Sequence, residues 1–287
     1  MPRSISVNRT RDPSVAEKRP LRVTCPDFAI AMFTTHKAIR NNVSVWFNQT
    51  MWKMLFPVIF GILFLTSCGG SVSTPVSSKQ SLRYLALGDS YTIGESVAEN
   101  ERWPNQLAEL VKSSPQFGGI EGGVEVTIIA RTGWTTDELW QGIQANPPQG
   151  TYDLVSLLIG VNNQYRGYDI NEYREQFRFL LGESIEYAGN DANRVIVLSI
   201  PDWGVTPFAS GRDREQIAKD IDAFNSVNWE ESEKAGVHFV DITPISREAI
   251  TDLSLIASDG LHPSGKMYFE WAKLTLPEAM KALGVKK

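Results

Sequence analysis

Three short segments of the chain carry side chains that suit acyl transfer. Gly88, Asp89 and Ser90 directly follow an apolar run, so the serine hydroxyl would lie on a turn beside helical backbone amides, which favour developing negative charge. A later apolar run ends shortly before Asn162. An asparagine amide can donate to an oxyanion without titrating, which a tetrahedral intermediate requires. Taken singly, each of these segments is also an ordinary turn sequence.

The third segment joins a carboxylate to an imidazole. Asp259 lies three residues before His262, so the carboxylate can accept from one imidazole nitrogen while the other nitrogen acts as a base. The chain has only two other histidines, His36 in the amino-terminal region and His238 at the start of an expected strand. His262 is therefore the best candidate for a general base.

The elements expected to position these segments alternate along the chain. Apolar runs typical of buried strands cover residues 83–87, 124–130, 154–159, 194–200 and 238–241. Amphipathic stretches typical of helices cover residues 103–112, 136–145, 170–187, 214–235 and 264–282. Pro277 is expected to bend or interrupt the last helix. The alternation predicts an α/β fold, a three-layer α/β/α sandwich around a central five-stranded parallel sheet.

In such a sheet, the loops at the carboxyl ends of the strands form the ligand crevice. All three segments occupy loops of this kind. Together with a fourth block they resemble the SGNH hydrolases of the GDSL esterase and lipase family. The four blocks, in chain order, are residues 88–90, Gly133, residues 160–163 and residues 259–262. The resemblance spans about residues 82–284 and implies a flavodoxin-like arrangement of the sheet.

The resemblance also implies a role for each matched residue. Ser90 would be the nucleophile, His262 the general base and Asp259 the residue that orients it. The oxyanion hole would combine the backbone N–H groups of Ser90 and Gly133 with the side chain of Asn162. The expected mechanism uses neither a metal ion nor an organic cofactor.

One position departs from the family pattern, because Asn163 stands where aspartate is usual. The donor asparagine is kept, so the chemistry is expected to survive, and the hydrogen bonding of the missing carboxylate is left open. Side chains of the crevice loops would line an apolar acyl pocket, stack on sugar rings or simply pack around the loops. The candidates for this substrate pocket are Tyr91, Trp134, Asn163, Tyr165 and Trp203.

The expected reaction is hydrolysis of carboxylic esters through an acyl-enzyme, as in an acyl esterase of the lysophospholipase kind. A carbohydrate O-deacetylase with the same catalytic set is an alternative. A lipid-anchored binding module without turnover is a third reading, against which the joint presence of serine, asparagine, aspartate and histidine speaks. The expected partner is a small-molecule or glycan ester, and a monomer is expected because no coiled coil is evident.

Composition excludes several other classes of protein. Residues 68–287 carry 19 Lys and Arg against 30 Asp and Glu, whereas residues 1–67 carry nine against three. An acidic body argues against a nucleic-acid partner, because such binding depends on cationic contacts to phosphate. The two cysteines, Cys25 and Cys68, are too few for a multi-cysteine zinc or iron–sulfur site.

The break in charge coincides with a targeting signal. Lys53 precedes an uncharged apolar run over residues 54–67, which is shorter than the roughly 20 residues of a membrane-spanning helix. The run ends in Leu-Thr-Ser-Cys, which resembles a bacterial lipobox with Cys68 as the lipidated residue. Residues 51–67 are therefore expected to be a lipoprotein signal peptide.

This signal divides the chain into four parts. Residues 1–50 would precede the true start at Met51, although a cytoplasmic extension with a signal anchor and a chance apolar run remain alternatives. Residues 68–81 are small and polar and suit a flexible tether. Residues 82–287 would form the hydrolase domain. The expected location is the periplasmic or cell-surface face of a membrane, and the outer membrane in a Gram-negative cell.

Overall fold

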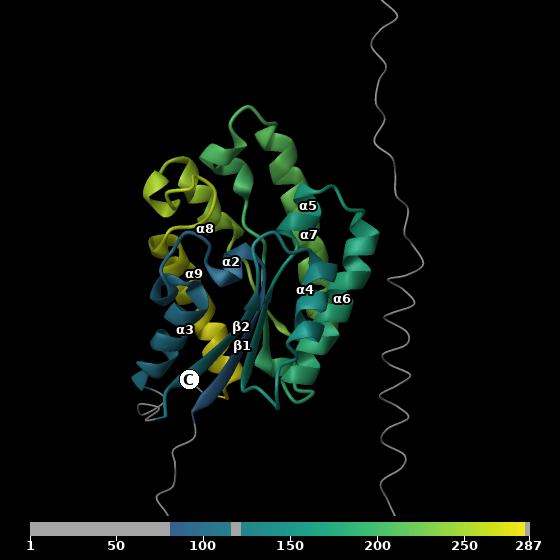
Figure 1. Ribbon diagram of the computed structural model, residues 1–287, viewed down its shortest axis with the longest axis vertical. Helices are drawn as coiled ribbons and strands as arrows, with labels where there is room; N and C mark the ends of the chain where they lie inside the picture. Colours follow the sequence, from purple (N-terminus) through teal and green to yellow (C-terminus); the bar gives the residue numbers. More distant parts are fainter. Residues whose placement is uncertain (1–80, 116–121, 285–287) are drawn as a thin grey trace, which may run out of the picture. The chain divides into compact units, whose positions relative to one another are not determined.

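A five-stranded sheet forms the centre of the structure, a computed structural model that describes residues 81–115 and 122–284 (Figure 1). All neighbouring strands pair in parallel, in the order β2-β1-β3-β4-β5. The strands are β1 (Leu82–Gly88), β2 (Val124–Ala130), β3 (Leu154–Leu158), β4 (Val195–Leu198) and β5 (His238–Val240). This is the flavodoxin-like order, and the predicted α/β architecture is confirmed.

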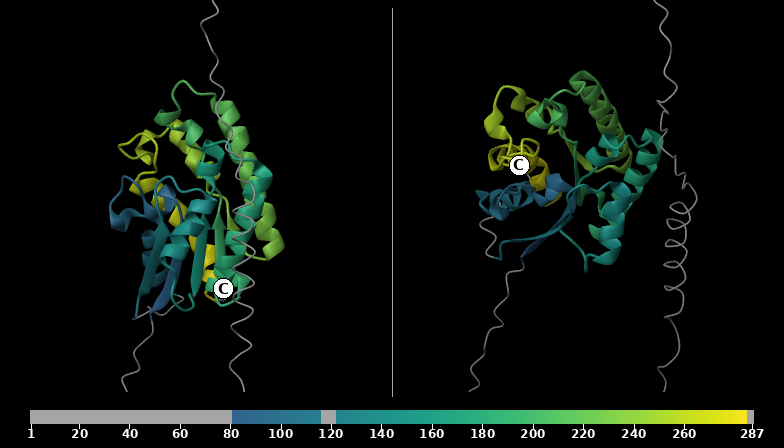
Figure 2. Two further views of the ribbon diagram at one scale, coloured as in Figure 1. Left: turned by 45° about the vertical axis from the view of Figure 1, so that its right-hand side comes forward. Right: turned by 45° about the horizontal axis from the view of Figure 1, so that its top comes forward.

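Two groups of helices cover the sheet (Figures 1 and 2). One face carries α3 (Trp103–Lys112) and α9 (Gly265–Ala282), which pack against each other. The other face carries α4 (Thr136–Ala145), α6 (Ile170–Tyr187) and α7 (Arg214–Ala235). These five helices begin and end within one residue of the bounds that the amphipathic pattern predicts.

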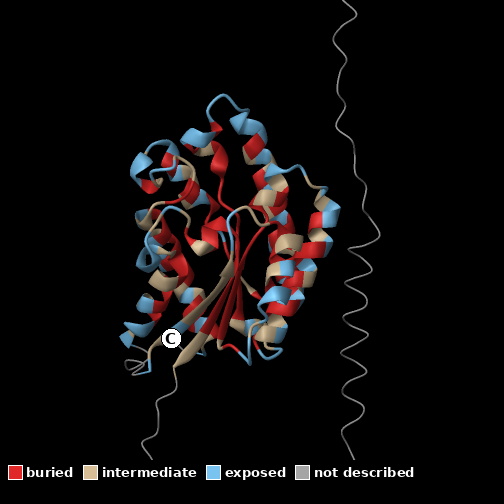
Figure 3. Cartoon of the chain, viewed as in Figure 1, coloured by how far each residue is buried: buried red, intermediate tan, exposed pale blue. Residues whose placement is uncertain are grey.

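Burial is deepest in the middle of the sheet (Figure 3). Every residue of β3 and β4 is buried, whereas β2, at one edge, is only partly covered. Strands covered by helices on both faces must be apolar at successive positions, which explains the continuous Val, Ile and Leu runs. The apolar stripe expected on α7 is also buried and consists of Ile217, Ile221, Phe224 and Val227.

Helix α9 continues through Pro277, so of the two expected effects of this proline, a bend or an interruption, the interruption does not occur. Proline lacks the N–H that would bond to the carbonyl of Lys273, four residues earlier. Both residues are exposed, so water can satisfy the freed carbonyl group. Packing of the helix face that contains Trp271, Thr275 and Ala282 outweighs the local loss.

The close pairing of β1 with β3 sets the geometry from which the site is built. Gly88, the last residue of β1, pairs with Leu158, the last residue of β3. A Cβ atom on Gly88 would lie 2.2 Å from the Thr92 hydroxyl oxygen and 2.4 Å from the Leu158 carbonyl oxygen. Only glycine fits here, and it allows the chain to turn at once into α2 (Ser90–Ile93).

The amino-terminal expectations fall outside the described residues. These are the upstream extension over 1–50, the signal peptide over 51–67, the lipidated Cys68 and nearly all of the tether over 68–81. Within the described ranges, no helix combines the length and the apolar composition needed to cross a bilayer.

Candidate active site

Ser90 is the first residue of α2, directly beyond the carboxyl end of β1. Asp89 caps this short helix by accepting a hydrogen bond from the Tyr91 N–H at 3.0 Å. The Ser90 side chain is nearly buried, at 4% exposure. Among the described residues, the Ser90 backbone N–H has no hydrogen-bond partner, so it remains available to a ligand.

Asn162 reaches the same point from α5 (Val161–Tyr165), the short helix that follows β3. Its Nδ2 donates to the Trp134 carbonyl at 3.0 Å and lies 3.4 Å from an Asp89 carboxylate oxygen. The first contact fixes the orientation of the amide. The second is long for a hydrogen bond, so the other N–H of Asn162 is available to donate to a stronger acceptor.

Asp259 and His262 lie on a tight loop before α9. The loop is closed by the Ala257 N–H, which donates to the His262 carbonyl at 2.8 Å, and by an antiparallel bridge between Ile256 and Pro263. Across it, His262 Nδ1 and an Asp259 carboxylate oxygen are 2.6 Å apart. The structure therefore places the predicted pair in direct contact.

The carboxylate of Asp259 has four hydrogen-bond donors. Its Oδ1 accepts from the backbone N–H groups of Leu261 and His262, each at 2.9 Å, and its Oδ2 accepts from Ser96 Oγ and faces His262 Nδ1. Partial burial acts to raise the pKa of Asp259, but these donors outweigh it and hold the pKa well below its usual range. Asp259 is therefore an anion at neutral pH.

Two contacts join the serine helix, α2, and the segment that follows it to the histidine loop, residues 256–263. The ring centroids of Tyr91 and His262 lie 5.5 Å apart, and Ser96 donates to Asp259 at 2.7 Å. Within the described residues, no hydrogen bond joins Ser90 Oγ to His262. Such contacts often tighten only when substrate is bound.

Gly133 lies on the loop between β2 and α4, at φ +87°, a conformation that favours glycine. Its carbonyl accepts from Arg166 at 2.6 Å, and Arg166 also pairs with Glu138 at 3.2 Å. The Gly133 N–H has no partner among the described residues. Sequence reasoning overlooked Arg166, although its place four residues after Asn162 puts both on one side of α5.

Asn163, which the sequence assigned to the substrate pocket, has a completely buried side chain whose polar atoms are bonded to Thr136. Its Oδ1 accepts from the Thr136 N–H at 3.1 Å, and its Nδ2 donates to the Thr136 hydroxyl oxygen at 2.8 Å. The Thr136 hydroxyl in turn donates to Gln176. The Thr136 hydroxyl thus both accepts and donates, and the Asn163 amide joins α5 to α4 through it. An ionised carboxylate at position 163 could not donate to this hydroxyl.

The other four pocket candidates lie in different surroundings. Tyr91 and Trp203, both nearly buried, line one small cavity together with Leu261 of the histidine loop. Tyr165 is 45% exposed and stands edge-on to Trp203, with ring centroids 5.3 Å apart. Trp134 lies instead against α4, where its ring fills the space beside Gly142.

Phe208 and Arg212 lie beside the rings of Tyr165 and Trp203 and were overlooked in the sequence. Phe208 is 42% exposed and lies near both Tyr165 and Trp203. The guanidinium of Arg212 lies 5.2 Å from the centroid of each of these three rings and donates to the Tyr165 hydroxyl at 3.1 Å. The signal that could have found them is their position on the loop after β4, which belongs to the crevice.

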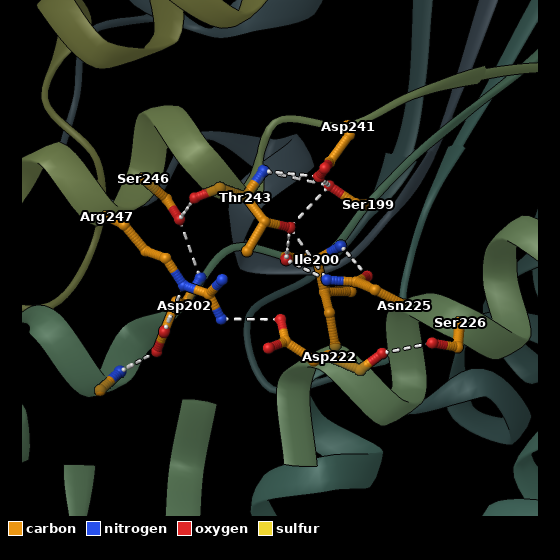
Figure 4. A network of polar contacts seen from close by, with 11 residues as sticks. Ser199, Ile200, Asp202, Asp222, Asn225, Ser226, Asp241, Thr243, Ser246 and Arg247 are labelled. Atoms are coloured by element: carbon orange, nitrogen blue, oxygen red, sulfur yellow. Dashed lines mark hydrogen bonds and ion pairs between the residues drawn. The ribbon is translucent and has the colours of Figure 1, made fainter. Parts of the chain in front are cut away.

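A polar network holds the loop after β4 in place (Figure 4). Asp202 accepts from the Gly204 N–H at 2.8 Å and from Arg247 Nε at 2.9 Å, and its own N–H donates to Ser246. The same loop reaches the histidine segment, because the Phe208 N–H donates to the Gly260 carbonyl at 3.0 Å. The network therefore supports both Trp203 and the loop that carries Asp259 and His262.

Asp89 is a site residue to which the sequence assigned no role of its own. Its carboxyl group is completely buried beside Ser90, and burial raises its pKa to about 7. Hydrogen bonds from the Tyr91 N–H and the Asn162 amide act in the opposite direction. Over the described ranges, no group of three or more His, Cys, Asp or Glu side chains is placed to hold a metal ion.

Comparison with known proteins agrees with this arrangement. The profile of the GDSL-like lipase/acylhydrolase family matches residues 86–268, well over half of the chain. The chain belongs to this family. It is accordingly an esterase or acylhydrolase, an enzyme that hydrolyses ester bonds. A search of curated protein sequences finds no match.

Solved structures of several hydrolases share the fold. The lipase/acylhydrolase from Enterococcus faecalis is 21% identical, with a TM-score of 0.51, over 72% of this chain and 99% of that chain. TesA is 17% identical, with a TM-score of 0.52, over 70% and 99%. The acetylxylan esterase Axe2 from Geobacillus stearothermophilus is 19% identical, with a TM-score of 0.51, over 72% and 97%. At these identities the likeness concerns the fold alone.

The buried carboxyl of Asp89 leads to a pH-dependent stability. In the unfolded chain Asp89 has the ordinary aspartate pKa of 3.8, whereas in the folded protein its pKa is about 7. The unfolded chain therefore loses this proton at lower pH, and we expect the free energy of unfolding to fall as the pH rises from 3.8 to about 7. Asp89→Asn keeps the helix cap and removes the charge, so its stability should fall less over this range. Urea unfolding at about pH 5 and about pH 8 measures the difference.

The matched control is Asp213→Asn, which makes the same change at the exposed cap of α7. It should leave the pH dependence of the native protein intact. Equal declines for the native protein and Asp89→Asn would contradict the raised pKa.

Proposed function

We propose that Ser90, His262 and Asp259 hydrolyse carboxylic esters through an acyl-enzyme. The observation that carries this proposal is the 2.6 Å contact between His262 Nδ1 and the Asp259 carboxylate. A proton held on Nδ1 by the anionic carboxylate leaves Nε2 as the basic nitrogen of the ring. His262 can then take the proton of the Ser90 hydroxyl, as a general base must.

The reaction proceeds in two steps, acylation of Ser90 and hydrolysis of the acyl-enzyme. The Ser90 oxygen bonds to the ester carbonyl carbon while its proton passes to His262, and collapse of the intermediate expels the alcohol, which receives that proton. Water then attacks the acyl-enzyme, again losing its proton to His262, and the acid leaves as Ser90 is reprotonated. The side chain of Asp259 stays ionised throughout and stabilises the imidazolium.

Three donors support an oxyanion hole in this mechanism. The backbone N–H groups of Ser90 and Gly133 lack partners among the described residues, and the second N–H of Asn162 has only a contact of 3.4 Å. Donors without strong internal partners are free to bind the negative charge that develops on the carbonyl oxygen. Arg166, through the Gly133 carbonyl, fixes the loop that carries one of them.

The proposed substrates are acyl esters, with the alcohol or acyl part lying against the aromatic group of Tyr165, Trp203 and Phe208. A carbohydrate O-deacetylase is the second candidate. It is favoured by one observation, the exposure of the Tyr165 and Phe208 rings beside the cationic Arg212, because sugars stack on exposed rings that have polar neighbours. A long acyl chain would be better served by a deep apolar pocket.

Substitution of the proposed nucleophile and oxyanion donor tests the mechanism. We expect Ser90→Ala to abolish hydrolysis of nitrophenyl acetate, and Asn162→Ala to lower kcat by roughly a hundredfold with little change in KM. Steady-state kinetics on folded variants measures both effects. Asn171→Ala, at an exposed position on α6, is the control and should retain full activity. Full activity of Ser90→Ala would exclude the proposed reaction.

A series of substrates separates the two candidate functions. An acyl esterase should show kcat/KM that is maintained or rises from acetyl to octanoyl nitrophenyl esters. A deacetylase should prefer acetyl esters and release acetate from acetylated xylan or peptidoglycan. Preference for acyl chains longer than acetyl, without acetate release, would reject the deacetylase.

We also propose that lipid on Cys68 anchors the enzyme to the periplasmic or cell-surface face of a membrane. The support is the apolar run over residues 54–67, its Leu-Thr-Ser-Cys ending and the polar stretch that follows. Cys68→Ala should move the protein from the membrane to the soluble fraction, while Ser73→Ala, in the polar stretch after the cysteine, should not. Equal membrane binding of Cys68→Ala would contradict lipid anchoring.

A further inference from the structure

The loop that follows the serine helix contacts all three parts of the site. This loop, residues 94–97, begins where α2 ends, and the N–H groups of Gly94 and Glu95 both donate to the Ser90 carbonyl at 3.0 Å. The Glu95 carboxylate accepts from the hydroxyl of Thr132, the neighbour of Gly133. One short segment therefore bonds to the nucleophile residue and to the loop that holds a proposed oxyanion donor.

The third contact reaches the proposed acid–base pair. Ser96 Oγ donates to Asp259 Oδ2 at 2.7 Å, the same oxygen that faces His262 Nδ1. Apart from His262, Ser96 is the only side chain in the described part of the chain that hydrogen-bonds to this carboxylate. The two residues are 163 positions apart in the sequence, so the bond joins distant loops.

The backbone at Ser96 indicates that this contact is built into the loop. Ser96 has φ +66°, in the left-handed region, and only one other non-glycine residue of the described ranges, Asn190, has a positive φ. This conformation is unfavourable for a residue with a Cβ atom. Glycine would adopt it freely, but glycine would bring no hydroxyl group to Asp259.

We propose that residues 94–97 form a clasp that fixes the catalytic parts relative to one another, with Ser96 as the positioning residue for Asp259. The clasp rests on the proposed function of Ser90, His262 and Asp259. Ser96 limits where the carboxylate lies and shares its negative charge. Asp259 can thereby orient the His262 ring towards Ser90. Because Ser96 shares the charge of the carboxylate, Asp259 does not bind the imidazolium form of His262 too strongly. The hydrogen bond between Thr132 and Glu95 fixes the loop that carries Gly133.

The pH profile of kcat/KM provides a readout that a merely structural role would not change. Loss of the Ser96 donor leaves more negative charge on the Asp259 oxygen that faces His262 Nδ1, so the pH dependence of the reaction should change. Asp259 contacts His262 directly, and Asp89 and Asp202 act together with Asp259 on Tyr91, the ring beside His262. Of these carboxylates, Asp259 is the one that a substitution of Ser96 alters, because Asp202 is paired with Arg247 and Asp89 accepts from the Tyr91 N–H.

The test compares Ser96→Ala with Ser96→Gly. Both lack the hydroxyl, whereas only glycine relieves the backbone strain. For both variants we expect the acid limb of the kcat/KM profile to move up by roughly half a pH unit. We expect kcat to fall about three- to tenfold, with KM changed by less than about twofold. Ser96→Gly should unfold at a temperature no lower than that of the native protein.

The Glu95 contact is tested by Thr132→Val, which keeps the shape of the side chain and removes the hydroxyl. This variant should lower kcat without moving the acid limb, because it acts on the oxyanion side of the site. Ser226→Ala removes an exposed hydroxyl on α7 that bonds only to a backbone carbonyl. It is the control and should match the native protein in every measurement.

Two results would overturn the inference. If neither Ser96 variant changes the acid limb or kcat, Ser96 does not position Asp259. If Ser96→Gly behaves as the native protein while Ser96→Ala does not, the backbone conformation and not the hydroxyl is responsible. Either result together with an inactive Ser90→Ala would reject the clasp and leave the proposed function standing, whereas an active Ser90→Ala would reject the function itself.

Discussion

The site depends on the pairing of β1 with β3 at the point where the strand order reverses. Gly88 and Leu158 end these strands side by side, and no side chain fits between them. The two chains then turn into short helices, so Ser90 and Asn162 follow within a few residues of paired strand ends. Parallel strands share one carboxyl edge, and the reversal opens a crevice there because the following connections go to opposite sides.

Loops gathered at one edge of a sheet lack ladder partners, and their backbone N–H groups must find other acceptors. Acidic side chains meet this need repeatedly. Asp89 caps the serine helix, Asp202 caps the segment after β4, and Asp259 accepts two N–H groups of its own loop. Glu95 differs from these three, because it accepts from a side-chain hydroxyl, that of Thr132. Several of the carboxylates that make the domain acidic therefore hold the loops of the site in place.

The polar groups of the site also differ in how far they are desolvated. Asp259 is partly exposed and surrounded by donors, which keeps it ionised, whereas Asp89 is fully buried and has a raised pKa. Two carboxyl groups that flank the serine and histidine thus differ in charge near neutral pH because of their surroundings. Burial could not be deduced for either from the order of residues, since it depends on how segments distant in the chain pack around the two loops.

The sequence by itself determined the layers of the fold and the proposed catalytic residues. Strands and helices follow from periodicity, a property of neighbouring residues, and Asp259 meets His262 because three residues suffice for a turn. Only the tertiary structure decided that Asn163 is buried, that Arg212 lies among three rings and that Ser96 reaches Asp259. Those contacts join segments far apart in the chain, and their geometry is set by loop conformations and packing that no local pattern records.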